Sequence, residues 1–167
     1  NHIGGQPMAG SIEFSGTLTG KDLRVSVIAS RFNTDITSRL VAGVEMALTD
    51  FGVSESNRVI YWVPGSFELP LAAKTVALQG KCDALVCVGA VIKGETAHFE
   101  YISAEVARGL ADVMQQTGVP LGFGVLTTYT AEQALERSKD DASNKGYEAT
   151  ASAIEMASLL KQLKEEK

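Results

Sequence analysis

The chain has 167 residues, which is long enough for one domain with a full hydrophobic core. Its formal net charge of −5 at pH 7 disfavours nucleic acid or an anionic membrane surface as the main partner. No apolar run approaches the roughly 18 residues that a membrane-spanning helix needs.

The N-terminal region is expected to stand apart from the core. Residues 1–10 predict a flexible arm, and residues 11–167 predict a single domain. Ile12 and Phe14 alternate with polar residues, which predicts a short strand over residues 11–15. Because this strand has no obvious partner in its own chain, we expect it to pair with a neighbouring copy.

The rest of the chain alternates between buried strands and helices. Short apolar runs predict the strands, and apolar residues that recur every three or four positions predict the helices. This alternation predicts a three-layer α/β/α sandwich, in which a four-stranded parallel sheet has helices on both faces. The predicted strands span 24–29, 58–63, 84–92 and 121–127, the predicted helices span 34–51, 68–79, 131–138 and 145–163, and a further helix carries Ile102, Val106, Leu110 and Val113 on one face.

The two cysteines, Cys82 and Cys87, do not predict a disulfide. Along an extended strand they would lie about 16 Å apart, whereas a disulfide requires Cα atoms within about 7 Å. We therefore expect two reduced, buried thiols in a cytosol-like compartment. Two histidines and two cysteines without ligand spacing also predict that there is no metal site.

Polar residues follow the third predicted strand, at the edge where parallel sheets bind ligands. The backbone N–H groups of Gly94, Glu95 and Thr96, next to a helix N-terminus, would favour an anion. His98 follows in the same turn, and an imidazole is suited to moving protons at neutral pH. The alternative for His98 is a hydrogen-bonded polar residue without a catalytic role.

Other residues near the strand ends have two possible roles each. Phe32 and Phe67 either offer a face for a flat heteroaromatic ring or cover the core or an interface. Glu68 either accepts hydrogen bonds from a ligand or complements a helix dipole. Gly122 and Gly124 predict the close approach of a ligand or of another backbone.

Arg137 and Lys145 are the basic candidates in the C-terminal part. Each is either solvated or part of an anion site, and an arginine can grip a phosphate in bidentate fashion. Asn33 or Thr34 is expected to cap the first helix. A P-loop NTPase is excluded because the motif G-x-x-x-x-G-K-S/T is absent. No dinucleotide-binding G-x-G-x-x-G opens the first helix, and no nucleophile elbow G-x-S-x-G occurs.

Six sequence blocks together resemble the 6,7-dimethyl-8-ribityllumazine synthase family of riboflavin biosynthesis. They occur in the family's order and cover nearly the whole chain from residue 22 onward. The blocks are SRFN at 30–33, VPGSFELP at 63–70, GAVIKGETAHFEY at 89–101, GVPLGFGVLTT at 118–128, EQALER at 132–137, and NKGYEA with AIEMA between 144 and 157.

The resemblance implies a flavodoxin-like fold and a transferase reaction that needs no cofactor. The substrates would be 5-amino-6-(D-ribitylamino)uracil and 3,4-dihydroxy-2-butanone 4-phosphate, which condense with release of phosphate and water. By residue match, His98 would shuttle protons, and Glu95, Thr96 and Arg137 would bind the phosphate. The ribitylaminouracil would contact Phe32, Ser66, Phe67, Glu68, Ala90, Val91, Ile92, Phe123 and Lys145.

The resemblance also implies a homopentamer in which Phe123, Arg137 and Lys145 reach the neighbouring subunit's site. Some family members pack twelve pentamers into an icosahedral shell. Segment 138–143 reads SKDDAS where shell-forming relatives tend to have a glycine-rich connection, so the choice between a pentamer and a shell stays open. Lys93 stands where arginine is common, and its positive charge is expected to be kept. A cytoplasmic location is expected, or a plastid if a transit peptide has been removed.

Two other functions remain open at this point. The first is a non-catalytic protein that keeps the fold and carries a flavin or a lumazine. The second is an unrelated flavodoxin-like module that binds a nucleotide. His98 and Arg137, which the first alternative does not require, are both present.

Overall fold

The structure is a computed structural model that describes residues 10–166. Its middle layer is a parallel sheet of four strands in the order β2-β1-β3-β4. The strands are β1 (Val25–Ser30), β2 (Arg58–Val63), β3 (Ala84–Ile92) and β4 (Leu121–Thr128). The helices are α1 (Thr34–Asp50), α2 (Leu69–Leu78), α3 (His98–Thr117), α4 (Ala131–Glu136) and α5 (Lys145–Glu165), with the 3₁₀ turns η1 (Glu55–Asn57) and η2 (Ser66–Glu68).

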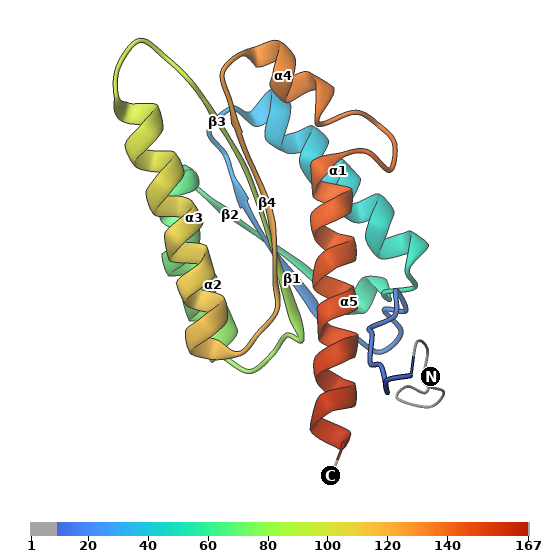
Figure 1. The fold of residues 1–167 in the computed structure, drawn as a ribbon. Helices are drawn as coiled ribbons and strands as arrows, with labels where there is room; N and C mark the ends of the chain where they lie inside the picture. The colour runs from blue at the N-terminus through green and yellow to red at the C-terminus, as the bar shows by residue number, and fades with distance from the viewer. Residues whose placement is uncertain (1–9, 167) are drawn as a thin grey trace.

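Helices cover both faces of the sheet. Figure 1 shows α2 and α3 on one side, and α1 and α5 on the other, with α4 at the carboxyl end of the sheet. Each face has its own core, with Leu40 and Ile154 on the α1–α5 side and Leu69 and Leu110 on the α2–α3 side. The predicted three-layer sandwich with a flavodoxin-like sheet is confirmed.

Strand β3 lies inside the sheet and is buried on both faces. Val86 and Val88 pack into the α1–α5 core, while Leu85 and Cys87 pack into the α2–α3 core. This double burial explains why the segment is apolar without alternation. Cys82 and Cys87 are both free, as predicted, and burial raises the pKa of each thiol.

The glycines of β4 make room for α5. A Cβ on Gly122 would lie 2.1 Å from the Ala149 carbonyl oxygen of α5, and one on Gly124 would lie 3.4 Å from the Ala149 Cβ. The close neighbour of Gly122 is therefore a helix backbone, as one of the two alternatives predicts, whereas the closest neighbours of Gly124 are Val88 and Cys87 of the adjacent strand β3. The close approach seats α5 on the sheet and so fixes the position of Lys145 at its first turn.

The strand predicted over residues 11–15 does not form within the single chain. Ser11 has an isolated bridge, and residues 12–17 have no strand assignment. This segment runs along α5 instead, where the Thr17 N–H donates to Ser158 Oγ at 3.1 Å. Pairing with a neighbouring copy stays a prediction, and the predicted arm lies outside the described residues apart from Gly10. Within residues 10–166, no helix combines the length and hydropathy required to cross a bilayer.

Candidate functional site

The carboxyl ends of all four strands meet at one edge of the sheet. Ser30 pairs with Val63, and Ile92 pairs with Thr128, so the loops that follow leave from the same edge. The pairing continues into these loops, because the Phe32 N–H donates to the Pro64 carbonyl at 3.1 Å. Residues that are far apart in the sequence are thereby brought to one crevice.

A pocket of about 470 Å³ opens at this edge, which we call the strand-end pocket. Its rim carries two open aromatic rings, since Phe32 is 69% exposed and Phe67 is 59% exposed. Covering large exposed apolar groups at a concave site with a ligand or a partner lowers the free energy. The pocket is lined by Phe32, Asn33, Pro64, Gly65, Ser66, Phe67, Glu68, Ala90, Val91, Ile92, His98 and Ile102.

Asn33 holds the strand-end pocket together in a way that the sequence did not reveal. It occupies the N-cap position of α1, as predicted, but its side chain makes no cap hydrogen bond. Its amide Nδ2 donates instead to the Ala90 carbonyl of β3 at 2.8 Å, and its backbone is left-handed with φ of 62°. The loop that carries Phe32 is thus tied to the end of β3.

The turn between β3 and α3 presents its backbone to solvent. Among the described residues, the N–H groups of Glu95 and Thr96 have no acceptor. His98 is the first residue of α3, so the partial positive charge of the helix N-terminus also lies here. The turn is braced from the side, because Lys93 Nζ lies 3.8 Å from Glu100 and 5.7 Å from the centre of the Tyr129 ring.

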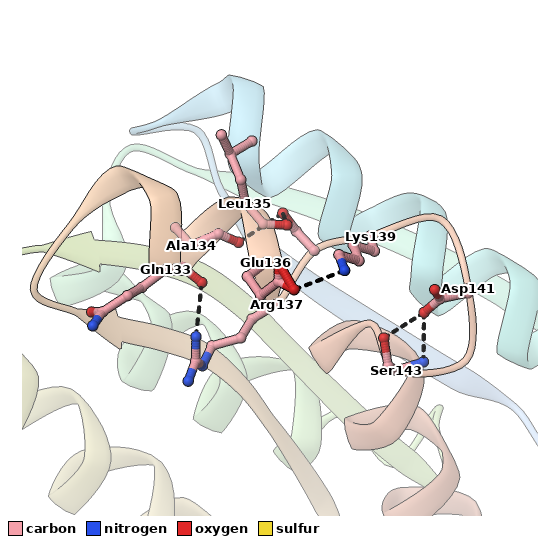
Figure 2. A network of polar contacts seen from close by, with 9 residues as sticks. Gln133, Ala134, Leu135, Glu136, Arg137, Lys139, Asp141 and Ser143 are labelled. Carbon is pink, nitrogen blue, oxygen red and sulfur yellow. Dashed lines mark hydrogen bonds and ion pairs between the residues drawn. The ribbon is translucent and has the colours of Figure 1, made fainter.

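A second pocket, of about 490 Å³, lies along β4 and is called the edge-strand pocket. It contains Phe123, Arg137 and Lys145. Figure 2 shows the Arg137 side chain reaching back along α4, where Nη1 donates to the Gln133 carbonyl at 3.1 Å. The remaining lining residues are Val125, Leu126, Thr127, Thr128, Glu136, Ser143 and Glu148.

The two pockets have no lining residue in common. Eight of the residues predicted to bind or catalyse line the strand-end pocket, and three line the edge-strand pocket. Glu95 and Thr96 line neither and lie in the exposed turn before α3. One chain therefore carries Phe32, Phe67 and the His98 imidazole in one hollow, and Phe123 with the two cations in another.

A third hollow, of about 360 Å³, lies at the amino end of the strands and contains none of the predicted site residues. Cys82, Asp83 and Lys164 are among the residues that line it. Within residues 10–166, no group of three or more histidine, cysteine or acidic side chains is arranged to hold a metal ion. The hollow at the amino end of the strands is thus separate from the residues that the sequence predicts for the site.

A flavodoxin-like sandwich with an aromatic-rimmed pocket beside a helix N-terminus belongs to the class of α/β proteins whose ligand sites lie at the carboxyl ends of the strands. Residues 22–161 match the family model of 6,7-dimethyl-8-ribityllumazine synthase, and the chain belongs to this family. The family consists of transferases in riboflavin biosynthesis, so the predicted activity and pathway are confirmed.

Proposed function

We propose that the strand-end pocket of one subunit and the edge-strand pocket of the adjacent subunit form a single active site within a homopentamer. The observation that supports this most strongly is the division of the binding residues between two pockets without a shared wall. A site that needs both sets is incomplete in one chain. The exposed rings of Phe32 and Phe67 give the strand-end pocket an apolar rim that a neighbour can cover.

In this composite site, the ribitylaminouracil lies in the strand-end pocket. Phe32 stacks on the flat pyrimidine, and the backbone at the end of β3 offers polar groups to its edge. The ribityl chain has several hydroxyl groups, which suit the carboxylate of Glu68. The contacts within one subunit come from Phe32, Ser66, Phe67, Glu68, Ala90, Val91 and Ile92, and the adjacent subunit adds Phe123 and Lys145.

The phosphate of the four-carbon substrate binds at the turn before α3. The open N–H groups of Glu95 and Thr96 and the N-terminus of α3 favour an anion there. Arg137 of the adjacent subunit completes the site with a guanidinium that can form charge-assisted hydrogen bonds to phosphate oxygens. This arrangement places the leaving phosphate close to His98.

The reaction requires positioning and proton transfer more than activation by a cofactor. An amine of the pyrimidine condenses with the ketone carbonyl and releases one water, phosphate is eliminated, and the ring closes with loss of a second water. Holding two substrates side by side makes the condensation effectively intramolecular. His98, which is exposed and lines the strand-end pocket, carries protons to and from the reacting groups.

Replacement of His98 tests this division of labour. We expect His98→Ala to reduce turnover without abolishing it, because proximity supplies much of the rate and general acid–base catalysis contributes roughly 10²- to 10⁴-fold. The assay follows the lumazine absorbance with both substrates. Complete loss of turnover by a folded variant contradicts the assigned role. Absence of product from the wild-type oligomer would support a non-catalytic carrier, and tight FMN binding by a monomer would support a nucleotide module.

Sedimentation tests the assembly. A single species with the mass of five chains supports the pentamer, and a much larger particle supports the icosahedral shell. A monomer at assay concentration with full activity contradicts the shared site. The two free thiols support a reducing compartment, either the cytoplasm or a plastid.

A further inference from the structure

Asn144 lies just before α5 and is 1% exposed. Its Nδ2 group donates to two carbonyls, those of Arg39 at 3.1 Å and Lys139 at 2.9 Å. Its Oδ1 atom accepts from the N–H groups of Gly146 at 2.7 Å and Tyr147 at 3.3 Å. A carboxamide has two N–H donors and two acceptor positions, so all four are satisfied inside the protein.

These four hydrogen bonds join three parts of the chain that meet behind the edge-strand pocket. Arg39 belongs to α1, Lys139 belongs to the loop after α4, and the two N–H groups belong to the first turn of α5. Lys145 is the next residue, and its N–H donates to the Arg137 carbonyl at 2.8 Å. The backbones of Arg137 and Lys145 are therefore hydrogen-bonded to each other directly beside the Asn144 side chain.

The other polar contacts of this loop are local. Figure 2 shows Glu136 paired with Lys139 at 2.7 Å, and Asp141 accepting from Ser143. The partners are only two or three residues apart and exposed, and such contacts add little stability. The Asn144 amide instead reaches 105 residues back to α1, so it links the loop to the hydrophobic core.

The surrounding backbone is shaped to receive this amide. A Cβ on Gly43 of α1 would lie 2.1 Å from Asn144 Oδ1, so only glycine leaves space at that position. A Cβ on Gly146 would lie 2.2 Å from the Leu40 carbonyl oxygen. Helices α1 and α5 thus approach closely on both sides of Asn144, which leaves the side chain little freedom to move.

We infer that Asn144 is a positioning residue for the reaction, because it holds Arg137 and Lys145 where the adjacent subunit's substrates meet them. The inference rests on the proposed roles of these two cations. A misplacement of about 1 Å at a binding group can cost up to roughly a hundredfold in rate. Loss of the two amide donors therefore affects phosphate binding although Asn144 touches no substrate.

The substitution Asn144→Ser separates positioning from helix capping. Serine is as good an N-cap as asparagine, so the start of α5 keeps an acceptor, but the donors to Arg39 and Lys139 are lost. We expect the KM for the butanone phosphate to rise about tenfold. Asn144→Gly removes the same donors and costs little at an N-cap, so it should give the same rise if the serine variant fails to fold.

Tyr147→Phe is the matched control. It removes the 2.8 Å hydrogen bond from Tyr147 Oη to Asp50, which joins the same two helices away from the loop. The KM for the butanone phosphate should stay within about twofold of wild type. An equal rise in the control and in Asn144→Ser would show that any loosening of the α1–α5 contact is enough, and would overturn the inference.

A double-mutant cycle with Arg137→Ala decides whether Asn144 acts through the guanidinium. Asn144→Ser should add no further rise in KM once Arg137 is gone. If the rise in KM of the double variant equals the product of the rises in the two single variants, the inference is overturned. If Arg137→Ala raises KM but Asn144→Ser does not, only the inference fails. If Arg137→Ala itself leaves KM unchanged, the proposed phosphate site fails.

Discussion

The strand-end pocket and the edge-strand pocket are built in different ways. The floor of the first is formed by Ala90 and Val91, both buried at the end of an interior strand. The cations of the second stand at the end of α4 and the start of α5, on either side of an exposed loop. The sheet therefore supplies a rigid apolar surface, whereas the ionic surface depends on how one loop is held. Substitutions in the strand-end pocket should weaken binding by removing contacts with the substrate. Substitutions around the edge-strand pocket can also weaken binding by moving a cation away from the substrate.

Among the substitutions that compare the two pockets through substrate binding, the largest effect is expected from Arg137→Ala, which removes a charge from the edge-strand pocket. A hydrogen bond between charged partners contributes about 1.5–3 kcal/mol, so the KM for the butanone phosphate should rise about a hundredfold. The measurement is initial rate against this substrate at saturating ribitylaminouracil. Lys139→Ala is the control, because Lys139 is a cation of the same loop that pairs with Glu136. Equal effects of the two substitutions would mean that only net charge matters.

Phe32→Ala tests the strand-end pocket and should have a smaller effect. Loss of a stacked ring costs about 1–1.5 kcal/mol, which predicts a rise of about tenfold in the KM for the ribitylaminouracil. The melting temperature should not change, since the ring is largely exposed and packs little within its own chain. Phe32→Tyr keeps the ring face and should behave like wild type. A large fall in melting temperature would assign Phe32 to the core or to a subunit interface.

Asn33 combines contact and position, because its hydrogen bond to Ala90 holds the loop that carries Phe32 at the strand-end pocket. Asn33→Gly removes the bond to the Ala90 carbonyl but tolerates the left-handed backbone, whereas Asn33→Ala also strains it. We expect the alanine variant to be about 1 kcal/mol less stable than the glycine variant in urea titrations. Equal stabilities would show that the backbone conformation is not maintained in solution.

The smallest effect is expected at the opposite edge of the sheet, where Asp83 binds Arg24. Burial alone would raise the pKa of this carboxyl, but hydrogen bonds from the Arg24 guanidinium and N–H lower it below its ordinary value. The carboxylate therefore stabilises the fold above its unfolded-state pKa, and this is lost as the pH falls through the folded pKa. Asp83→Asn should lower the free energy of unfolding at pH 7 by less than about 1 kcal/mol.

The pH dependence provides the control for that prediction. The difference in stability between wild type and Asp83→Asn should begin to shrink as the pH falls to about 4, where the unfolded carboxyl becomes protonated, and it should disappear only below the lowered pKa of the folded state. The rate of the reaction should not respond, because Asp83 lies far along the strands from the carboxyl edge. A difference in stability that persists unchanged in acid would mean that packing, not charge, is lost.

Much of the fold follows from local pattern, and the exceptions have physical causes. Strand β3 was predicted with the bounds that the structure has, because a segment buried on both faces must be apolar throughout. Helix α4 was predicted to reach residue 138 but ends at Glu136, where its short apolar pattern gave no clear stop. The segment over 11–15 needs a partner that one chain does not contain, so its prediction is untested.

The candidate site was predictable where a residue was chosen for the chemistry of its own side chain, and unpredictable where a side chain bonds to a distant backbone group. Phe32, His98 and Arg137 could be singled out by residue type and place. Asn33 was expected to cap a helix, but its amide reaches a carbonyl 57 residues away. Asn144 bonds to α1 over an even longer separation. Such partners are set by tertiary packing, and local sequence carries no signal for them.

Mixing two defective chains tests the shared site most directly. One chain carries Phe32→Ala and His98→Ala, the other carries Arg137→Ala, and oligomers containing both are isolated through two different tags. With random assembly, roughly a quarter of the sites combine an intact strand-end pocket with an intact neighbouring Arg137, so activity should rise well above that of either parent. Activity no greater than the average of the two parents would show that each chain builds its site alone.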